Sequence, residues 1–257
     1  MRGPSGVFAL VLAETAAGAA AVLWLAPLWG AVRRGFFLLT SAVAFGCAVL
    51  AALSLSAAAE GGEATFAWRA TAVTAGVLGL SMAALLFRWD TPGRILGLLS
   101  VPASVVMLVG LASLGGPSFP IALFVLLAGS AFMGAVTDGL LLGHWYLTDR
   151  RLSREHIHRL SLLLIVAVVV EGIAIVSTGF AGSPSPAAGF SPFLSIAGLA
   201  SWLALGMAAA TALVAVLIRA SLRGTSGRAV QAATGFFYLA VITAFTAEMA
   251  AKIGFLG

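Results

Sequence analysis

Four acidic residues lie inside long apolar stretches of the sequence, where carboxylates are rare. They are Glu14, Asp138, Glu171 and Glu248. A charge near the middle of a bilayer costs at least ~2.5–3.5 kcal/mol on insertion scales, so such residues normally face a bundle interior and often mark a pathway. Burial favours the neutral form of a carboxyl group, which suits proton exchange. The four acids are therefore candidates for proton transfer or ligand binding. The alternative is that each is a structural acid bonded to a neighbouring helix.

The last apolar stretch carries further polar residues on one side. At 100° per residue of an α-helix they fall within one arc, and they are Gln231, Thr234, Tyr238, Glu248 and Lys252. A stripe of this length predicts contact with a polar cavity or with another polar helix. Glu248 and Lys252 are also four residues apart, so a simple pair within one helix is the alternative.

The polar segment 138–159 contains every histidine of the chain: His144, His156 and His158. We add His144 to the candidates, as a proton donor at the end of the acid series. A b-type haem commonly takes two histidines from facing helices. Here all three lie in or beside one predicted loop, so the pattern does not favour haem, and the spacing of His156 and His158 does not favour a metal site. The single cysteine, Cys47, excludes an internal disulfide and a cysteine-based metal cluster.

Composition defines the class of protein that must position these residues. Of the 257 residues, 61% are hydrophobic and 9% are charged, whereas soluble domains carry roughly 25% charged residues. Apolar runs of about 20 residues recur, the length that crosses a ~30 Å hydrocarbon core as a helix. The sequence predicts an all-α, polytopic transmembrane bundle that forms one integral membrane domain over 1–257. Its eight spans are expected at about 5–27, 35–57, 66–88, 94–114, 119–143, 159–181, 192–219 and 229–253.

Basic residues gather in alternate connections between the predicted spans. The connections after spans one, three, five and seven hold 11 of the 14 basic residues: Arg33, Arg34, Arg88, Arg94, Arg150, Arg151, Arg154, Arg159, Arg219, Arg223 and Arg228. We count Arg2, Arg69 and Lys252 on the other side. The positive-inside rule then predicts both termini outside and the arginine-rich connections inside. Because the arginines are spread over short loops, they do not indicate nucleic-acid binding.

This orientation orders the acids by depth. Asp138 is expected near the inner end of its span, Glu14 and Glu171 near mid-depth, and Glu248 in the outer third. The four acids therefore predict a ladder across the membrane. Two four-span halves are conceivable, as in transporters built from repeats, although the halves show no convincing sequence match.

Two stretches together carry a family resemblance. Thr-Asp-Gly-Leu-Leu-Leu-Gly-His-Trp-Tyr-Leu at 137–147 and Gln-Ala-Ala-Thr-Gly-Phe-Phe-Tyr at 231–238 resemble a family of uncharacterised bacterial multi-span proteins. This resemblance implies a location in the bacterial cytoplasmic membrane and no assigned role. Eight helices with outside termini also resemble, in architecture, the quinol-oxidising membrane anchors of dimethyl sulfoxide and polysulfide reductases. No site residue is carried over from either resemblance. Motifs of known membrane enzymes, such as Gly-x-Ser-x-Gly or His-Glu-x-x-His, are absent from the sequence, which leaves enzymatic activity undecided.

Three hypotheses follow from these observations. The first is an integral membrane subunit of a redox or respiratory assembly that binds quinone and exchanges protons through the buried carboxylates, with redox subunits as partners. The second is a proton-coupled transporter or channel for a small solute, whose polar stripe lines the cavity. The third is a membrane assembly or structural factor that docks a partner through the arginine loop at 150–159.

Overall fold

A computed structural model of the chain describes residues 3–25, 34–58, 61–148, 153–178, 198–224 and 227–256. These residues form eight α-helices and no strand: α1 (Gly3–Leu25), α2 (Arg34–Ala58), α3 (Gly62–Leu86), α4 (Asp90–Ala112), α5 (Phe119–Thr148), α6 (Glu155–Ser177), α7 (Leu199–Ser221) and α8 (Gly227–Leu256). All eight are long and apolar enough to cross a membrane. The structure thus confirms the predicted all-α bundle of eight spans and indicates a multi-pass integral membrane protein.

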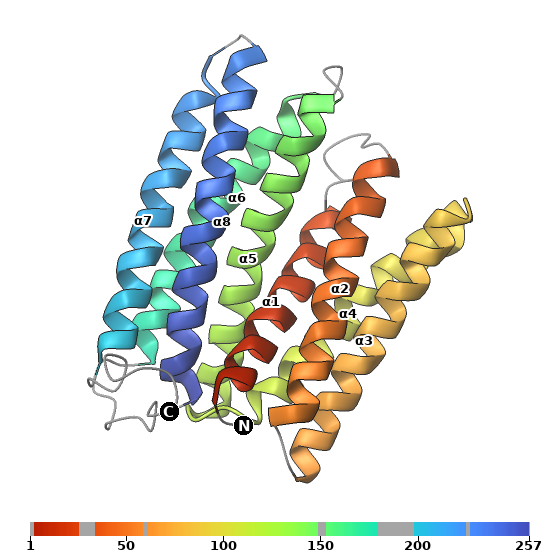
Figure 1. Cartoon of the computed structure of the whole chain (residues 1–257), viewed down its shortest axis with the longest axis vertical. Coiled ribbons are helices and arrows are strands. Elements are labelled where there is room, and N and C mark those ends of the chain that lie inside the picture. The colour runs from red at the N-terminus through yellow and green to blue at the C-terminus, as the bar shows by residue number, and fades with distance from the viewer. Residues whose placement is uncertain are drawn as a thin grey trace.

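The helices form two groups of four. Helices α1 to α4 pack in sequence order and α4 returns to α1, while α5 to α8 pack in the same order and α8 returns to α5. Figure 1 shows α1 and α5 in the middle of the bundle, with α2–α4 on one side and α6–α8 on the other. Both termini lie at the same end (Figure 1). Helix α1 joins the two groups, because it contacts α5 and α8 as well as its own group.

Helices α1 and α5 approach each other through glycines. A Cβ atom on Gly18 would lie only 1.8 Å from the carbonyl oxygen of Ser130, and one on Gly134 would lie 2.4 Å from the carbonyl carbon of Gly18. Small residues permit such backbone contact between membrane helices. Helix α1 is also the most buried of the spans described, so Glu14, one turn before Gly18, lies at the centre of the molecule.

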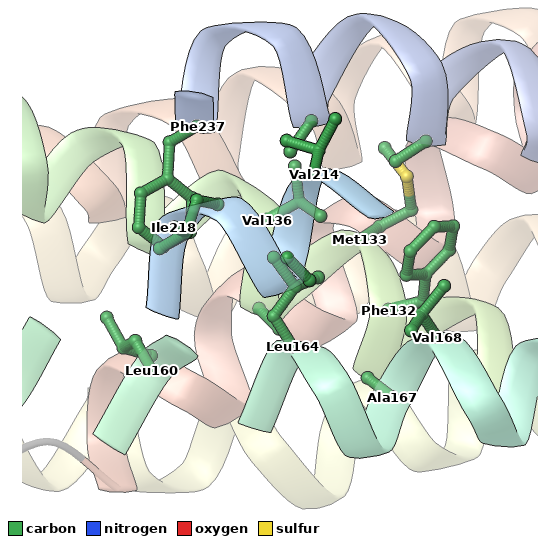
Figure 2. Packing of buried hydrophobic residues seen from close by; sticks show 14 of the residues in the cluster. Phe132, Met133, Val136, Leu160, Leu164, Ala167, Val168, Val214, Ile218 and Phe237 are labelled. Carbon is green, nitrogen blue, oxygen red and sulfur yellow. The ribbon is translucent and has the colours of Figure 1, made fainter. Parts of the chain in front are cut away.

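The second group has a close-packed apolar core. Figure 2 shows side chains of α5 and α6 meeting those of α7 and α8, with Phe132, Val136, Leu164, Ile218 and Phe237 among the labelled residues. Gly139 of α5 leaves the space for the Phe237 ring, since a Cβ atom there would lie 2.1 Å from it. Asp138, the residue before this glycine, therefore lies in a tightly packed region.

Arginines tie together the helix ends opposite the termini. The Arg34 guanidinium donates to the carbonyl oxygens of Leu85 and Leu86 at the end of α3 and lies 3.7 Å from Asp90. Arg219 of α7 donates to the His158 carbonyl oxygen of α6, with a distance of 3.2 Å. The Arg34 bonds reach carbonyl groups in the last turn of α3, where partners within the helix run out, whereas the Arg219 bond links α7 to the first turn of α6. Arg33, Arg150 and Arg151 lie outside the described residues.

Candidate functional site

Lys252 of α8 is completely buried and forms two ion pairs. Its Nζ lies 2.8 Å from Oε1 of Glu14 on α1 and 2.9 Å from Oε2 of Glu248 on α8. Both carboxylates are also completely buried. The Lys252 side chain thus points into the bundle, although the residue was counted by its position near the end of the span. The alternative that Glu248 and Lys252 pair within one helix is confirmed, with Glu14 as a second partner.

Glu171 of α6 faces the same group. It is completely buried and interacts electrostatically with Glu248 and Lys252, and Glu14 interacts with it as well. At 1.5 Å per residue, the three acids lie roughly 9–17 Å from the helix ends nearest the termini. We call Glu14, Glu171, Glu248 and Lys252 the lysine cluster. It draws on three helices and joins the two four-helix groups.

A glycine provides the space for the cluster on α5. A Cβ atom on Gly129 would lie 2.6 Å from Oε1 of Glu14, so any larger residue there would displace the carboxylate. The Glu14 side chain thus packs directly on the α5 backbone while it reaches Lys252. The sequence offers no local signal for this contact, since Glu14 and Lys252 stand near opposite ends of the chain.

The charges of the lysine cluster do not balance when every group is ionised. Three carboxylates then face one ammonium group, and the net charge of the cluster is −2. Such an excess is costly in a medium of low dielectric constant, where even a matched pair must offset a large desolvation cost. Two bound protons make the cluster neutral, and these protons are shared among coupled groups rather than owned by one residue. The arrangement can therefore accept and release protons. Among the described residues, no group of histidines, cysteines and acids has the geometry of a metal site.

Asp138 lies apart from the lysine cluster. It is completely buried on α5, and neither of its carboxylate oxygens has a hydrogen-bond partner in the part of the chain that the structure describes. Among the described residues, its surroundings differ from those of Glu14 in that no ion pair reaches it. The structure therefore gathers three of the four predicted acids in one place and leaves the fourth alone, rather than spacing all four along a ladder.

The polar stripe of α8 does not keep to one face of the bundle. Thr234, Glu248 and Lys252 are buried, whereas Gln231 and Tyr238 are exposed. The buried residues of α8 recur at steps of three and four: Val230, Ala233, Phe237, Ala240, Ala244 and Ala247. At 100° per residue, Thr234 and Lys252 point in the same direction and Glu248 lies about 40° from them, whereas Gln231 and Tyr238 lie toward the opposite edge of the arc. The stripe therefore straddles the boundary between the buried and the exposed side of α8.

The histidines lie on helices rather than in a loop, because α5 continues to Thr148 and α6 begins at Glu155. His144 is exposed on α5, and His158 is half-buried on α6. His156 is buried, and neither ring nitrogen has a hydrogen-bond partner among the described residues. None of the three lies among the residues that interact with the lysine cluster.

No protein-family model matches this chain, and neither a curated protein nor a solved structure is detectably similar to it. The lysine cluster is thus the feature from which a function is inferred. Sequence reasoning found its three acids from their apolar context, but it missed the central role of Lys252 and the space left by Gly129. The spacing of Glu248 and Lys252 was the one signal that pointed to the lysine.

Proposed function

We propose that this integral membrane protein is a subunit of a redox or respiratory assembly, in which it exchanges protons with a membrane quinone at the lysine cluster. The observation that supports the proposal is the group of three buried carboxylates around one buried ammonium, held by α1, α6 and α8. A carboxylate site of this kind inside a membrane protein is typical of proton relays. The proposed quinone is a cofactor that diffuses in the bilayer, and redox subunits are the proposed partners.

The stoichiometry of the cluster suits quinol chemistry. Oxidation of one quinol to quinone breaks two O–H bonds and releases two protons and two electrons. The cluster passes from a net charge of −2 to neutral when its carboxylates accept these two protons. The two electrons leave to a redox centre of a partner subunit, and quinone reduction reverses each step.

The three acids of the lysine cluster differ in their contact with Lys252, and this difference suggests the order in which they accept protons. Lys252 holds Glu14 and Glu248 by ion pairs, which keeps two carboxylates oriented toward one point. Glu171 forms no ion pair within 4.0 Å among the described residues, although it interacts with the same charges. We therefore assign Glu171 as the group that accepts the first proton, with Glu14 and Glu248 sharing the second.

We further propose a bacterial cytoplasmic membrane with the termini outside. The described arginines at helix ends, Arg34, Arg154 and Arg219 among them, lie at the end opposite the termini (Figure 1), and basic residues favour the cytoplasmic side. The cluster is then nearer the outer surface. Protons from an oxidised quinol leave to that side and contribute to a transmembrane proton gradient.

Replacement of Glu171 by Gln tests the proposal in membranes that contain the complete assembly. We expect Glu171→Gln to abolish quinol-dependent electron transfer while the protein remains inserted. Asp138→Asn is the matched control, because it neutralises an equally buried acid outside the cluster and should retain transfer. Unchanged transfer in Glu171→Gln contradicts the role of Glu171. Redox subunits or quinone that co-purify with the tagged protein provide an independent check by mass spectrometry.

A proton-coupled transporter is the second candidate, and the division into two four-helix groups favours it. Transporters built from repeats place their substrate and ion sites between the halves, and the lysine cluster joins the two halves through α1 and α8. This candidate predicts that liposomes containing this chain alone carry a proton or solute flux that Glu14→Gln removes. Sealed, inactive liposomes contradict it.

A further inference from the structure

A cavity of about 200 Å³ lies between α1, α4 and α5. Its lining includes Ala17, Gly18 and Ala21 of α1, Ser104 of α4 and Ser130 of α5. The cavity is open on one side, where two further lining residues are exposed: Val105 and Leu127. In a membrane this opening faces the hydrocarbon chains, so a lipid-soluble molecule can enter it without crossing water.

The size and shape of the cavity fit a substituted six-membered ring. An apolar cavity of about 150 Å³ accepts benzene, so this one has room for the ring and its small substituents. Ala17, Gly18 and Ala21 give α1 a smooth wall, because none of them carries more than one side-chain carbon. A long chain attached to the ring can leave through the opening between Val105 and Leu127. The apolar lining disfavours a charged or sugar-like solute.

The two serines supply hydrogen-bond acceptors. The Ser130 hydroxyl donates to the Leu126 carbonyl oxygen and the Ser104 hydroxyl donates to the Ser100 carbonyl oxygen, each at 2.7 Å. Each hydroxyl has a single hydrogen, so its lone pairs are what remains for a ligand. A ligand with O–H groups can donate to them, whereas a ligand with only carbonyl groups cannot. The lining is almost wholly apolar, and a ligand that donates to these hydroxyl groups leaves their bonds to the helix backbone intact.

The cavity adjoins the lysine cluster through the backbone of α5. Ser130 lines the cavity, and its neighbour Gly129 packs against the Glu14 carboxylate. Ala17, also in the lining, lies one turn from Glu14 on α1. The cavity and the Glu14 carboxylate thus lie on two sides of the same turn of α5.

We propose that this cavity binds the head group of an isoprenoid hydroquinone, with its ring against Ala17 and Gly18, a hydroxyl group donating to Ser130 and its tail in the lipid. The inference rests on the proposed function, because it supplies the binding site for the quinol whose protons the cluster accepts. It adds the location of the site and a preference for the reduced form.

The first test fills the cavity. Ala131 lines it and is exposed on α5, so Ala131→Phe places a ring in the opening without disturbing buried packing. Ala42 is an equally exposed alanine of α2 outside the lining, and Ala42→Phe is the matched control. Binding of decyl-chain benzohydroquinone and naphthohydroquinone to the purified full-length protein in detergent is measured by equilibrium dialysis. We expect Ala131→Phe to weaken binding at least about tenfold, the cost of one lost buried contact of ~1.4 kcal/mol, and Ala42→Phe to leave it unchanged.

The second test examines the preference for the reduced form. Ser130→Ala removes one acceptor, and a single hydrogen bond contributes roughly 1 kcal/mol, so hydroquinone affinity should fall about fivefold. Affinity for the matching decyl-quinone should stay the same, because the quinone has no hydroxyl group to donate. Ser104→Ala tests the second acceptor in the same way. Equal losses for both redox forms contradict the assigned hydrogen bond.

The outcomes separate this inference from the proposed function. Hydroquinone that binds Ala131→Phe as tightly as the unmodified protein overturns the cavity as the site, while the Glu171→Gln assay still decides the role of the cluster. Displacement of hydroquinone by an ordinary diacyl phospholipid at similar affinity overturns it in favour of a lipid-chain site. Specific binding in the cavity together with unchanged electron transfer in Glu171→Gln supports the site and contradicts the proton-exchange function.

Discussion

Glu14 and Asp138 are equally buried acids on neighbouring helices, and their surroundings are opposite. The Glu14 carboxylate lies 2.8 Å from the Lys252 ammonium and shares it with Glu248. Asp138, in contrast, is completely buried and has no hydrogen-bond partner among the described residues. The comparison shows that equal burial can go with or without a nearby counter-charge. A counter-charge and coupled neighbours are needed to stabilise the ionised form as well as the neutral one.

The two sites should respond differently to every change of charge. In the lysine cluster, removal of Lys252 leaves three buried carboxylates without a counter-charge, and breaking a buried pair in this way costs ~3–5 kcal/mol. At Asp138, removal of the acid takes away polar atoms that have no partner, which costs little or stabilises the fold. Four substitutions test this contrast, from the largest expected effect to the smallest.

Lys252→Met should have the largest effect on stability. It keeps the length of the side chain but leaves three buried carboxylates without a counter-charge, and we expect a loss of about 3–5 kcal/mol in the free energy of unfolding. The loss should grow as pH rises. Without Lys252 the three carboxylates must each bind a proton to remain buried, and proton binding becomes less favourable at higher pH. Denaturation by SDS in mixed micelles at several pH values measures both effects. A loss that does not depend on pH contradicts the charge-balance account.

Glu14→Gln should have an intermediate effect. It breaks the ion pair between α1 and α8 but leaves Lys252 paired with Glu248, so we expect a loss of about 1–3 kcal/mol. Glu248→Gln is the matched comparison, since it keeps the pair between the two helices. The same unfolding assay should show a smaller loss for Glu248→Gln, because the pair that it removes lies within one helix. The reverse order contradicts the role of Glu14 as the link between helices.

Asp138→Leu should change stability by less than about 1 kcal/mol, or increase it. The substitution replaces two oxygens without partners by methyl groups of similar bulk in an apolar core. Thermal unfolding in detergent, followed by circular dichroism, measures the shift in Tm. A large loss of stability means that Asp138 has a stabilising partner within the bundle, and it contradicts the claim that only Glu14 has one.

Glu155→Gln should have the smallest effect. Glu155 pairs with Arg159 on α6, but both side chains are about half exposed, and exposed pairs of this spacing contribute ~0.3–0.5 kcal/mol. Because Glu155 lies in the first turn of α6, its interaction with the helix dipole adds a few tenths of a kcal/mol to the stability. We expect a loss below about 1 kcal/mol in the unfolding assay. A loss as large as that of Glu14→Gln means that a buried ion pair contributes no more to stability than an exposed one, which contradicts the contrast.

The sequence was sufficient to predict the spans, because a run of about 20 apolar residues leaves few alternatives to a membrane helix. It also singled out the three acids of the cluster, since a carboxylate is conspicuous in such a run. The partner of Glu14 could not be predicted. Lys252 stands near the other end of the chain, and an apolar helix carries little information about which neighbour its faces meet.

Two predictions differed from the structure for identifiable reasons. The ladder used only the position of each acid along its span, whereas contacts also depend on the direction of each side chain and on its length. A lysine side chain that reaches away from its own Cα brings acids of different expected depth together. The stripe on α8 was defined by an arc of about a hundred degrees, which is wide enough to reach from the buried side of the helix to its exposed side.

The most direct test of the central claim is the infrared difference spectrum between the quinol-loaded and quinone-loaded protein, recorded in H₂O and D₂O. Proton transfer to the lysine cluster predicts a protonated carboxyl band that shifts in D₂O, decreases in Glu14→Gln and Glu171→Gln, and persists in Asp138→Asn. A spectrum in which this band persists in both cluster variants, or disappears with Asp138→Asn, contradicts the claim that the cluster is the site of proton exchange.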